Sequence, residues 1–440
     1  MTVPTHNLYD FVHQVTEKRF WLVYFYPWGS RDLKNIIDYQ ISQEFLSLTQ
    51  GLDPAYISAY KIFPKNLPYF FYNIEETQPM LFCHDQEPLN FDFYKNVTED
   101  DAFQSVLFPV SLVPTDLNLR YARPMNVLKR VVLLHSEINS AELQKYESTG
   151  QYLGAYWWSH AVISKDWFRF AENDQRLQHL DERKRFLVYS RAHTGSRSYR
   201  VLFQEMLQNL AVVDHCQFES FYFKNVDSNS SAIYVPDDFN CTSISVVLET
   251  VFWDQRIHLT EKILRSIACG HPFILAAGPG SLKLLRNYGF QTFGPWINED
   301  YDTETDHQTR LLMIAKEMSR IKNLPLNEFD QLISACRDIA QKNKQRFFSA
   351  EFTDQIVTEL KTNALKAWTE IWNEFDLTPY RTWINYVDQT LEQDNSPENK
   401  EILKWVRPFV EFIDRGGSFE QYQRHEHGLD NKSNANSHDV

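Results

Sequence analysis

Short apolar runs alternate with segments of helical length in the second half of the chain, and this alternation constrains the fold more than any other feature. Each apolar run has the length of a buried strand, and each segment between them has the length and apolar spacing of a helix. Strands separated in this way form a parallel sheet, because parallel neighbours need a long crossover connection. The sequence therefore predicts an α/β domain. Its expected strands span residues 186–189, 243–248 and 273–277, and its expected helices span 197–210, 261–269 and 281–288.

The first half of the chain carries further apolar runs, which predict a second α/β sheet. Polar clusters follow two of these runs directly, at 84–88 and at 135–137. Ligands of open α/β sheets bind beyond the carboxyl ends of the strands, so both clusters lie where a ligand is expected. The expected strands of this half span residues 20–26, 80–83, 131–134 and 161–164.

A chain of 440 residues is expected to form two domains, because one compact core rarely grows beyond about 250–300 residues. We expect α/β domains at 1–178 and 183–306. The strongly charged stretch at 172–185 predicts a solvated linker or helix face, with a basic patch as the alternative. A helical extension at 307–415 is expected to cross back to the first domain, and 416–440 is typical of a disordered tail. The extension's helices are expected at 311–322, 329–344 and 354–374.

Charge and composition limit the classes of partner. The formal net charge of −14 argues against a partner bound mainly through nucleic-acid phosphates, although a local basic cleft would be compatible with one. The five cysteines include no closely spaced pair, so they predict neither a zinc site nor a disulfide framework. The chain start lacks the features of a signal peptide, and no apolar run is long enough for a transmembrane helix. We therefore expect a cytoplasmic protein without a membrane span.

The clearest chemical pattern begins at Glu249, which ends a predicted strand. Thr260 opens the next predicted helix, whose first turn offers unpaired N–H groups and the positive end of the helix dipole to a phosphate. Lys262 adds a positive charge, and Glu261 can accept hydrogen bonds from a ribose. Glu249 is expected to face the same crevice. Thr-Glu-Lys alone also describes an ordinary capped helix, but the whole order of residues suits a nucleotide-diphosphate sugar.

This pattern resembles the nucleotide-sugar half of the GT-B glycosyltransferases, most closely the fucosyltransferase-like group. The match consists of Glu249, residues 260–262 and the small-residue turn with proline at 268–272. The chain is also similar to uncharacterised glycosyltransferase-like proteins of bacteria and their viruses, through 85–88 and 135–137. The resemblance implies two Rossmann-like domains with C-terminal helices. The first would face the acceptor, and the second would bind a nucleotide sugar.

The resemblance also extends to the start of the second domain, where the group has a strand that ends in Ser and then an Arg at a helix start. Ser190 matches the first position, and Arg197 or Arg200 matches the second. By this resemblance one of the two arginines, together with Lys262, would neutralise the diphosphate, and Glu261 would bind the ribose. The alternative for both arginines is solvated charge on a helix face.

A glycosyltransferase of this kind needs a general base that deprotonates the acceptor hydroxyl, and the first domain is expected to supply it. The carboxylate candidates are Glu87, Asp85 and Glu137, each of which follows a predicted strand. His84 and His135 are alternatives with a suitable ordinary pKa. A structural role such as helix capping is the competing interpretation for each of them.

The sequence predicts a metal-independent reaction that uses no cofactor. No strand ends in an Asp-x-Asp metal motif, and the acidic run at 302–306 is expected to be a solvated turn. Lysine, arginine and a helix dipole would stabilise the leaving diphosphate in place of a metal ion. Residues 156–160 include two tryptophans and are candidates for a sugar-stacking wall, with core packing as the alternative.

The leading hypothesis is therefore a glycosyltransferase that moves a sugar from a nucleotide-diphosphate sugar to a hydroxyl group on a glycan or similar acceptor. A viral enzyme that glycosylates DNA bases is a variant, which the net charge disfavours. A non-catalytic nucleotide-binding module is a further alternative. A GT-B-shaped epimerase or phosphorylase fits less well, since a phosphorylase would need a cofactor lysine or a second phosphate site.

Overall fold

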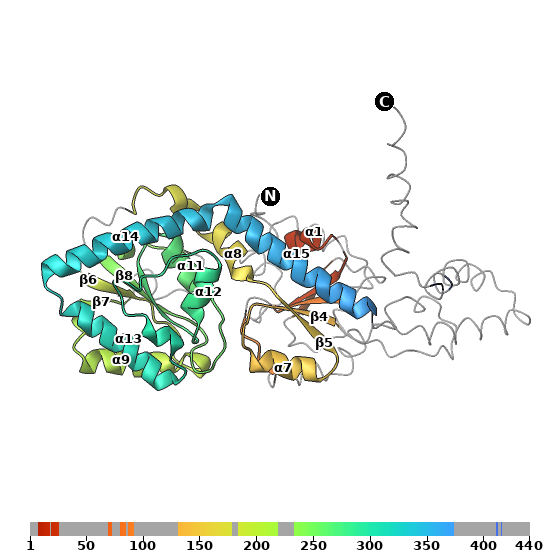
Figure 1. Ribbon diagram of the computed structural model, residues 1–440, viewed down its shortest axis with the longest axis horizontal. Coiled ribbons are helices and arrows are strands. Elements are labelled where there is room, and N and C mark those ends of the chain that lie inside the picture. Colours follow the sequence, from red (N-terminus) through yellow and green to blue (C-terminus); the bar gives the residue numbers. More distant parts are fainter. Residues whose placement is uncertain are drawn as a thin grey trace, which may run out of the picture.

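The computed structural model is a mixed α/β structure with two separate sheets (Figure 1). No helix in the part of the chain that it describes combines the length and apolarity needed to cross a membrane. Asp85 and the expected tail at 416–440 lie outside the described residues. The described residues are 8–17, 19–25, 69–72, 80–84, 87–91, 131–177, 184–218, 233–373, 411 and 415.

The first sheet has five strands in the order β2-β1-β3-β4-β5. Strand β2 is antiparallel to β1, and all other neighbours are parallel. His84 pairs in register with His135 at the ends of β3 and β4, so the segments that follow these two strands leave the sheet side by side. The strands are β1 (Trp21–Phe25), β2 (Tyr69–Tyr72), β3 (Met80–His84), β4 (Val131–His135) and β5 (Tyr152–Tyr156).

The strand expected at 161–164 is wrong: these residues belong to helix α8 (Ser159–Trp167), and the edge strand is β5. The apolar run was too short to distinguish a strand from a buried helix by its period. All residues from 159 to 164 are buried, because α8 packs against helices α11 and α15. Strand β5 was missed because Gly154, a poor strand former, interrupts it.

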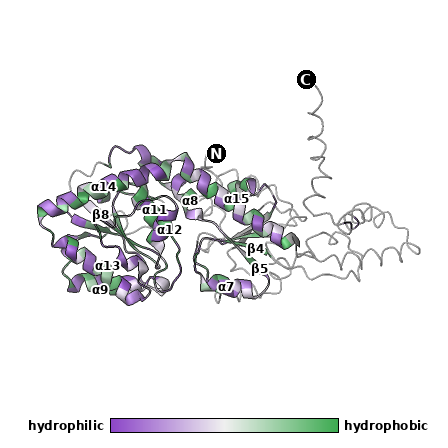
Figure 2. Cartoon of the chain, viewed as in Figure 1, coloured by the Kyte–Doolittle hydropathy of each residue, from purple (hydrophilic) through white to green (hydrophobic). Residues whose placement is uncertain are grey.

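The second sheet has four parallel strands in the order β7-β6-β8-β9. The three expected strands are confirmed as β6 (Lys184–Val188), β8 (Thr242–Leu248) and β9 (Phe273–Ala276). The two-residue strand β7 (Cys216–Gln217) is too short to leave a sequence signal. Helices cover both faces of this sheet, which is the reason every residue of β8 and β9 is buried (Figures 1 and 2).

The shorter helices connect the strands or cap the sheets. Those of the first half are α1 (Leu8–Val15), α7 (Ala141–Ser148), α8 and the 3₁₀ helix η3 (Arg169–Asn173). Those of the second half are α9 (Tyr199–Asn209), α10 (Pro236–Asn240), α11 (Glu261–Ala268), α12 (Ser281–Asn287) and the 3₁₀ helices η4 (Gly195–Arg197), η5 (Val213–His215) and η8 (Asp300–Thr303).

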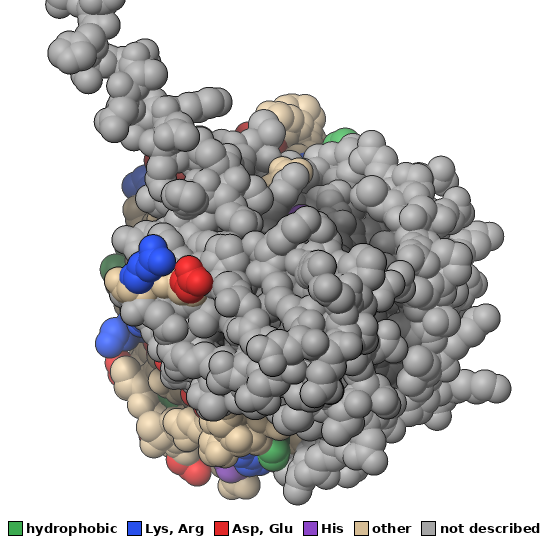
Figure 3. Space-filling view, turned by 90° about the vertical axis from the view of Figure 1, so that its right-hand side faces the viewer, with side chains coloured by type: hydrophobic (Ala, Val, Ile, Leu, Met, Phe, Trp, Pro, Cys, Tyr) green, Lys and Arg blue, Asp and Glu red, His purple; other side chains and the backbone are tan. Residues whose placement is uncertain are grey.

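Three long helices follow, α13 (His307–Lys322), α14 (Leu326–Phe348) and α15 (Ala350–Asn373), as the periodicity predicted. Helix α15 crosses from the second sheet to the first, where it packs on β4, β5 and α1 (Figure 1). The Trp368 indole donates to the carbonyl of Arg19 at 3.1 Å, and the Asn363 amide donates to that of Tyr156 at 2.8 Å. The expected return of a C-terminal helix to the first half is confirmed. Figure 3 views the molecule from the side at which α15 ends, and the described side chains that are visible there are of several chemical types.

Candidate functional site

The start of helix α11 is built around a buried carboxylate. Glu249, at the end of β8, accepts hydrogen bonds from the Thr260 backbone N–H at 3.1 Å and from its hydroxyl at 2.6 Å. The same hydroxyl accepts from the Lys262 N–H at 3.4 Å and caps the helix. Burial raises the pKa of Glu249 above its ordinary value, against the opposing Lys262 charge. Glu249 therefore fixes the helix start from inside the fold.

Lys262 and Glu261 form an ion pair in the first turn of α11. The Lys262 ammonium lies 3.0 Å from the Glu261 carboxylate and donates to the Thr260 hydroxyl at 3.0 Å. Burial alone would raise the pKa of Glu261, but the charges of Lys262 and His160 outweigh burial and hold it well below the ordinary value. Glu261 is thus a carboxylate at neutral pH, and the partly exposed Lys262 ammonium stands at the positive end of the helix.

Two buried histidines lie beside this turn, and their pairing was not predicted, although His160 belongs to the candidate sugar-stacking segment 156–160. His160 of α8 lies 4.0 Å from Glu261, and its ring meets that of His258 edge to face at 5.4 Å. His258 Nδ1 shares a hydrogen bond of 3.1 Å with the Ser136 hydroxyl, while its Nε2 has no hydrogen-bond partner among the described residues. Burial holds the pKa of His258 well below its ordinary value, so the ring is neutral. No motif marks these residues, since only the fold brings them together.

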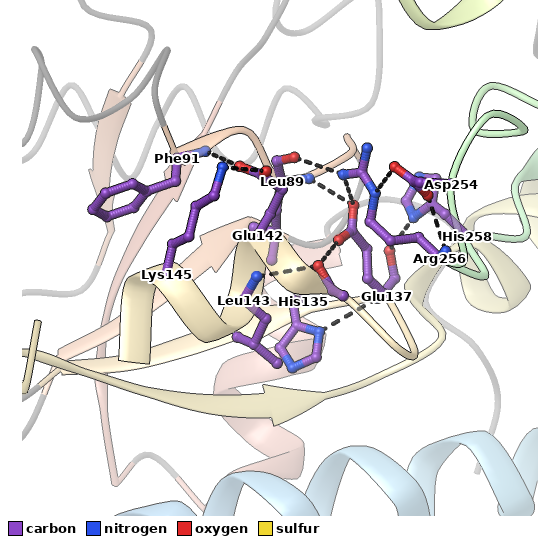
Figure 4. Close-up of polar contacts among 12 residues, drawn as sticks. Leu89, Phe91, His135, Glu137, Glu142, Leu143, Lys145, Asp254, Arg256 and His258 are labelled. Atoms are coloured by element: carbon purple, nitrogen blue, oxygen red, sulfur yellow. Dashed lines mark hydrogen bonds and ion pairs between the residues drawn. The ribbon is translucent and has the colours of Figure 1, made fainter. Parts of the chain in front are cut away.

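Glu137, a candidate base, is fully engaged inside the structure (Figure 4). One carboxylate oxygen accepts from the Leu89 N–H at 2.7 Å and from the Arg256 guanidinium at 3.3 Å, and the other accepts from the Ser140 hydroxyl. Ser140 in turn caps helix α7. Burial raises the pKa of Glu137 to about 6. With both oxygens occupied, Glu137 serves the packing of the loop.

Glu87 is a candidate base on which charges of the second half act. Its side chain is half-buried, and burial raises its pKa to about 7 against the opposing charges of Arg197 and Lys262, while Glu261 raises it further. These electrostatic interactions indicate that Glu87 lies in the field of the Arg197, Lys262 and Glu261 charges. The other histidine candidates, His84 and His135, are buried, and burial lowers the pKa of each to about 4.

The two candidate arginines have different surroundings. The buried Arg200 guanidinium donates to the carbonyls of Leu248 at 2.7 Å and Arg191, which ties the loop after β6 to the end of β8. Arg197 is half-buried at the end of η4, and its charge acts on Glu87. Ser190 shares a hydrogen bond of 3.1 Å with His193. Of the two candidate arginines, Arg197 is the one that is partly exposed and whose charge acts on Glu87.

The acidic run at 302–306 is the expected solvated turn only in part, because residues 303, 305 and 306 are exposed but Asp302 is not. Asp302 is buried and accepts from the backbone N–H groups of Leu282 at 2.9 Å and Lys283 at 3.1 Å, at the start of α12. Asp306 caps α13 by accepting from the Thr309 N–H at 2.8 Å. Within the described ranges, no three His, Cys, Asp or Glu side chains group as a metal site requires.

The two tryptophans of the candidate sugar wall, Trp157 and Trp158, are buried in the core. The Trp158 indole donates to the Leu259 carbonyl at 2.9 Å and joins the two halves just before α11. Core packing, the alternative named for this segment, is what these two rings do.

Comparison of the chain with protein-family models, curated protein sequences and solved structures finds no match in any of the three. The residues themselves define the kind of site. Two cationic side chains, Arg197 and Lys262, act on one carboxyl group with a raised pKa, Glu87, beside a helix start that carries the carboxylate Glu261. Such a set can bind an anionic group and accept a proton next to it.

Replacement of Thr260 by valine is expected to lower the free energy of unfolding by about 2 kcal/mol, because the helix loses its cap and Glu249 loses a buried donor. Urea unfolding followed by circular dichroism measures the change. Thr303→Val is the matched control, since that exposed hydroxyl donates to a single carbonyl. Equal stability of T260V and T303V would show that the Thr260 cap does not contribute to the free energy of unfolding.

Proposed function

We propose that this protein is a metal-independent glycosyltransferase of the GT-B type, which transfers a sugar from a nucleotide-diphosphate sugar to a hydroxyl group of a glycan or similar acceptor. The observation that carries the proposal is that the charges of Arg197, Lys262 and Glu261, in the second half, act on Glu87, which follows β3 in the first half. Donor and acceptor chemistry would then face each other between two α/β units.

The second half supplies the groups that a nucleoside diphosphate requires. Lys262 and Arg197 are cations, and the start of α11 adds its dipole. Together they would stabilise the negative charge that develops on the leaving diphosphate. Glu261 is ionised and would accept hydrogen bonds from ribose hydroxyls. A bound diphosphate would compete with Glu261 for the Lys262 ammonium, which already has partial access to solvent.

The first half supplies the proton acceptor. With a pKa of about 7, Glu87 is divided between its acid and carboxylate forms at neutral pH, which suits a general base. In the proposed step the acceptor hydroxyl gives its proton to Glu87 while its oxygen bonds to the anomeric carbon of the sugar. The bond from that carbon to the diphosphate oxygen breaks, and the nucleoside diphosphate leaves with the electron pair.

The architecture supports the GT-B assignment. Ligands of parallel α/β sheets bind at the carboxyl ends of the strands, and Glu87 and Glu249 follow or end such strands in separate sheets. The return of α15 to the first sheet links the two units, as the resemblance led us to expect. The fold and the placement of these residues together support the proposed class of reaction.

The proposal is tested by a thermal-shift screen against GDP, UDP, ADP, CDP and TDP, followed by assays for diphosphate release from the matching nucleotide sugars. One diphosphate at ~100 times its dissociation constant is expected to stabilise the protein by about 2.7 kcal/mol. Stabilisation without release from any sugar donor would indicate a non-catalytic nucleotide-binding module. Release that requires duplex DNA would indicate the DNA-base enzyme, and no stabilisation at all would refute the proposal.

A further inference from the structure

The segment that carries Glu87 is held by side chains. After β3 ends at His84, the backbone N–H groups of Leu89 and Phe91 donate to two carboxylates, Glu137 and Glu142, each at 2.7 Å. Both carboxylates belong to the first half of the chain, in the loop and helix that follow β4. A further contact ties this segment directly to the second half.

Arg256 makes that contact from the loop between β8 and α11 (Figure 4). Its Nη1 donates to the Leu89 carbonyl at 2.8 Å and lies 3.3 Å from the Glu137 carboxylate. Its Nε donates to Asp254 at 2.7 Å, so the guanidinium is oriented from its own loop as well. The side chain is largely buried, at 15% exposed, which strengthens its charged hydrogen bonds relative to those at a surface.

The backbone on both sides of this contact is rigid. Ile138 and Ile257, the residues after Glu137 and Arg256, exchange two backbone hydrogen bonds of 3.0 Å each. The Arg256 carbonyl also packs so closely on Gly278 that a Cβ there would lie 1.9 Å away. Arg256 thus belongs to a fixed loop of the second half, and it binds the backbone at Leu89, two residues from Glu87.

We propose that Arg256 is a positioning residue, which reaches across the two halves and, through the Leu89 carbonyl and Glu137, holds Glu87 against the first turn of helix α11. This inference rests on the proposed function, in which Glu87 is the general base, and it explains how Glu87 is held in position. Small displacements of a reacting group reduce turnover strongly, by about 100-fold for roughly 1 Å. A residue that touches neither substrate would therefore control the rate.

Steady-state kinetics of Arg256→Met and Arg256→Lys test the proposal. We expect R256M to lower kcat by about 10–100-fold and to leave the KM for the donor within about threefold, because Lys262 and Arg197 are untouched. R256K, which keeps the charge and can reach one acceptor at a time, is expected to retain an intermediate kcat. Arg320→Met is the matched control, since Arg320 contacts one carboxylate, Glu317, and the Trp296 carbonyl away from the site.

The pH profile separates positioning from general structural damage. Burial beside α11 holds the pKa of Glu87 near 7, where Arg197, Lys262 and Glu261 face it. If R256M releases Glu87 toward solvent, the acidic limb of kcat should move to lower pH. An unchanged limb with unchanged kcat in R256M would overturn the proposal, and so would an equal loss in R320M.

A stability cycle tests the same placement without any activity. The raised pKa means that the folded protein keeps a proton on Glu87 that the unfolded chain has released, so stability falls as pH rises from about 4.5 to about 7. Glu87→Gln should therefore raise Tm at pH 8 but not at pH 5. We expect R256M to remove most of this pH-dependent gain. If the gain is the same with methionine at 256, the positioning inference fails even when the proposed function holds. If no donor is ever turned over, the proposed function is refuted, and this cycle still shows whether Arg256 positions Glu87.

Discussion

Replacement of Glu87 by glutamine is expected to reduce sugar transfer by about 10²–10⁴-fold, the usual contribution of a general base. The amide keeps the size of the side chain but accepts no proton from the acceptor hydroxyl. Donor binding should persist, because Lys262, Arg197 and Glu261 remain in place. Initial rates of diphosphate release with saturating acceptor measure the loss, and a thermal shift with the diphosphate confirms that the donor still binds.

The same carboxyl group sets the expected pH dependence. Activity should rise with pH through about 7, because burial raises the pKa of Glu87 to about 7 and only the carboxylate form is a base. The residual activity of E87Q should lack this rise. Glu205→Gln, on the exposed face of α9, is the control for loss of one negative charge. Wild-type rates in E87Q would assign the proton to another group, and Asp85 would be tested next.

Replacement of Lys262 by methionine is expected to weaken nucleoside diphosphate binding by about 10–100-fold, the range for loss of one charged hydrogen bond. Methionine keeps most of the aliphatic stem, so the start of α11 should stay folded. The capping hydroxyl of Thr260 and the buried Glu249 do not depend on the ammonium for their mutual hydrogen bonds. Isothermal titration with the diphosphate found in the thermal-shift screen gives the two dissociation constants.

Lys283→Met provides a matched comparison, because Lys283 lies in helix α12, which follows strand β9 of the same sheet as β8. Lys283 also lies in the first turn of a helix that follows a strand, but there the backbone N–H groups already bind the Asp302 carboxylate. That turn has no place for a phosphate, so K283M should bind the diphosphate as the parent does. Equal losses in K262M and K283M would point to a general effect of positive charge, and equal affinity in K262M would remove α11 from the donor site.

The second sheet was largely predictable because its strands are buried on both faces. Continuous apolar runs ending in polar loops gave β6, β8 and β9 within a residue or two of their observed bounds. The first half was harder. Strand β5 contains Gly154, and the buried helix α8 has an apolar run like that of a strand, so local pattern led to the wrong element there.

The candidate site shows the same division. The cap at Thr260 and the paired charges of Glu261 and Lys262 follow from adjacent residues, and the sequence indicated them. The sequence did not indicate that the Glu249 side chain points into the fold, because its hydrogen-bond partner Thr260 is eleven residues away. The same holds for Arg200, whose guanidinium lies on carbonyls far along the chain.

The sequence by itself determined the α/β class, the helix that starts at Thr260 and the C-terminal helices, because these depend on local periodicity and capping. Only the tertiary structure decided on which carboxyl group the charges of Arg197 and Lys262 act. Glu87 and Glu137 both follow neighbouring strands, yet Arg256, Leu89 and Ser140 occupy Glu137, while Glu87 faces α11. Such a choice depends on contacts between residues more than a hundred positions apart, such as Glu137 and Arg256, which no local pattern encodes.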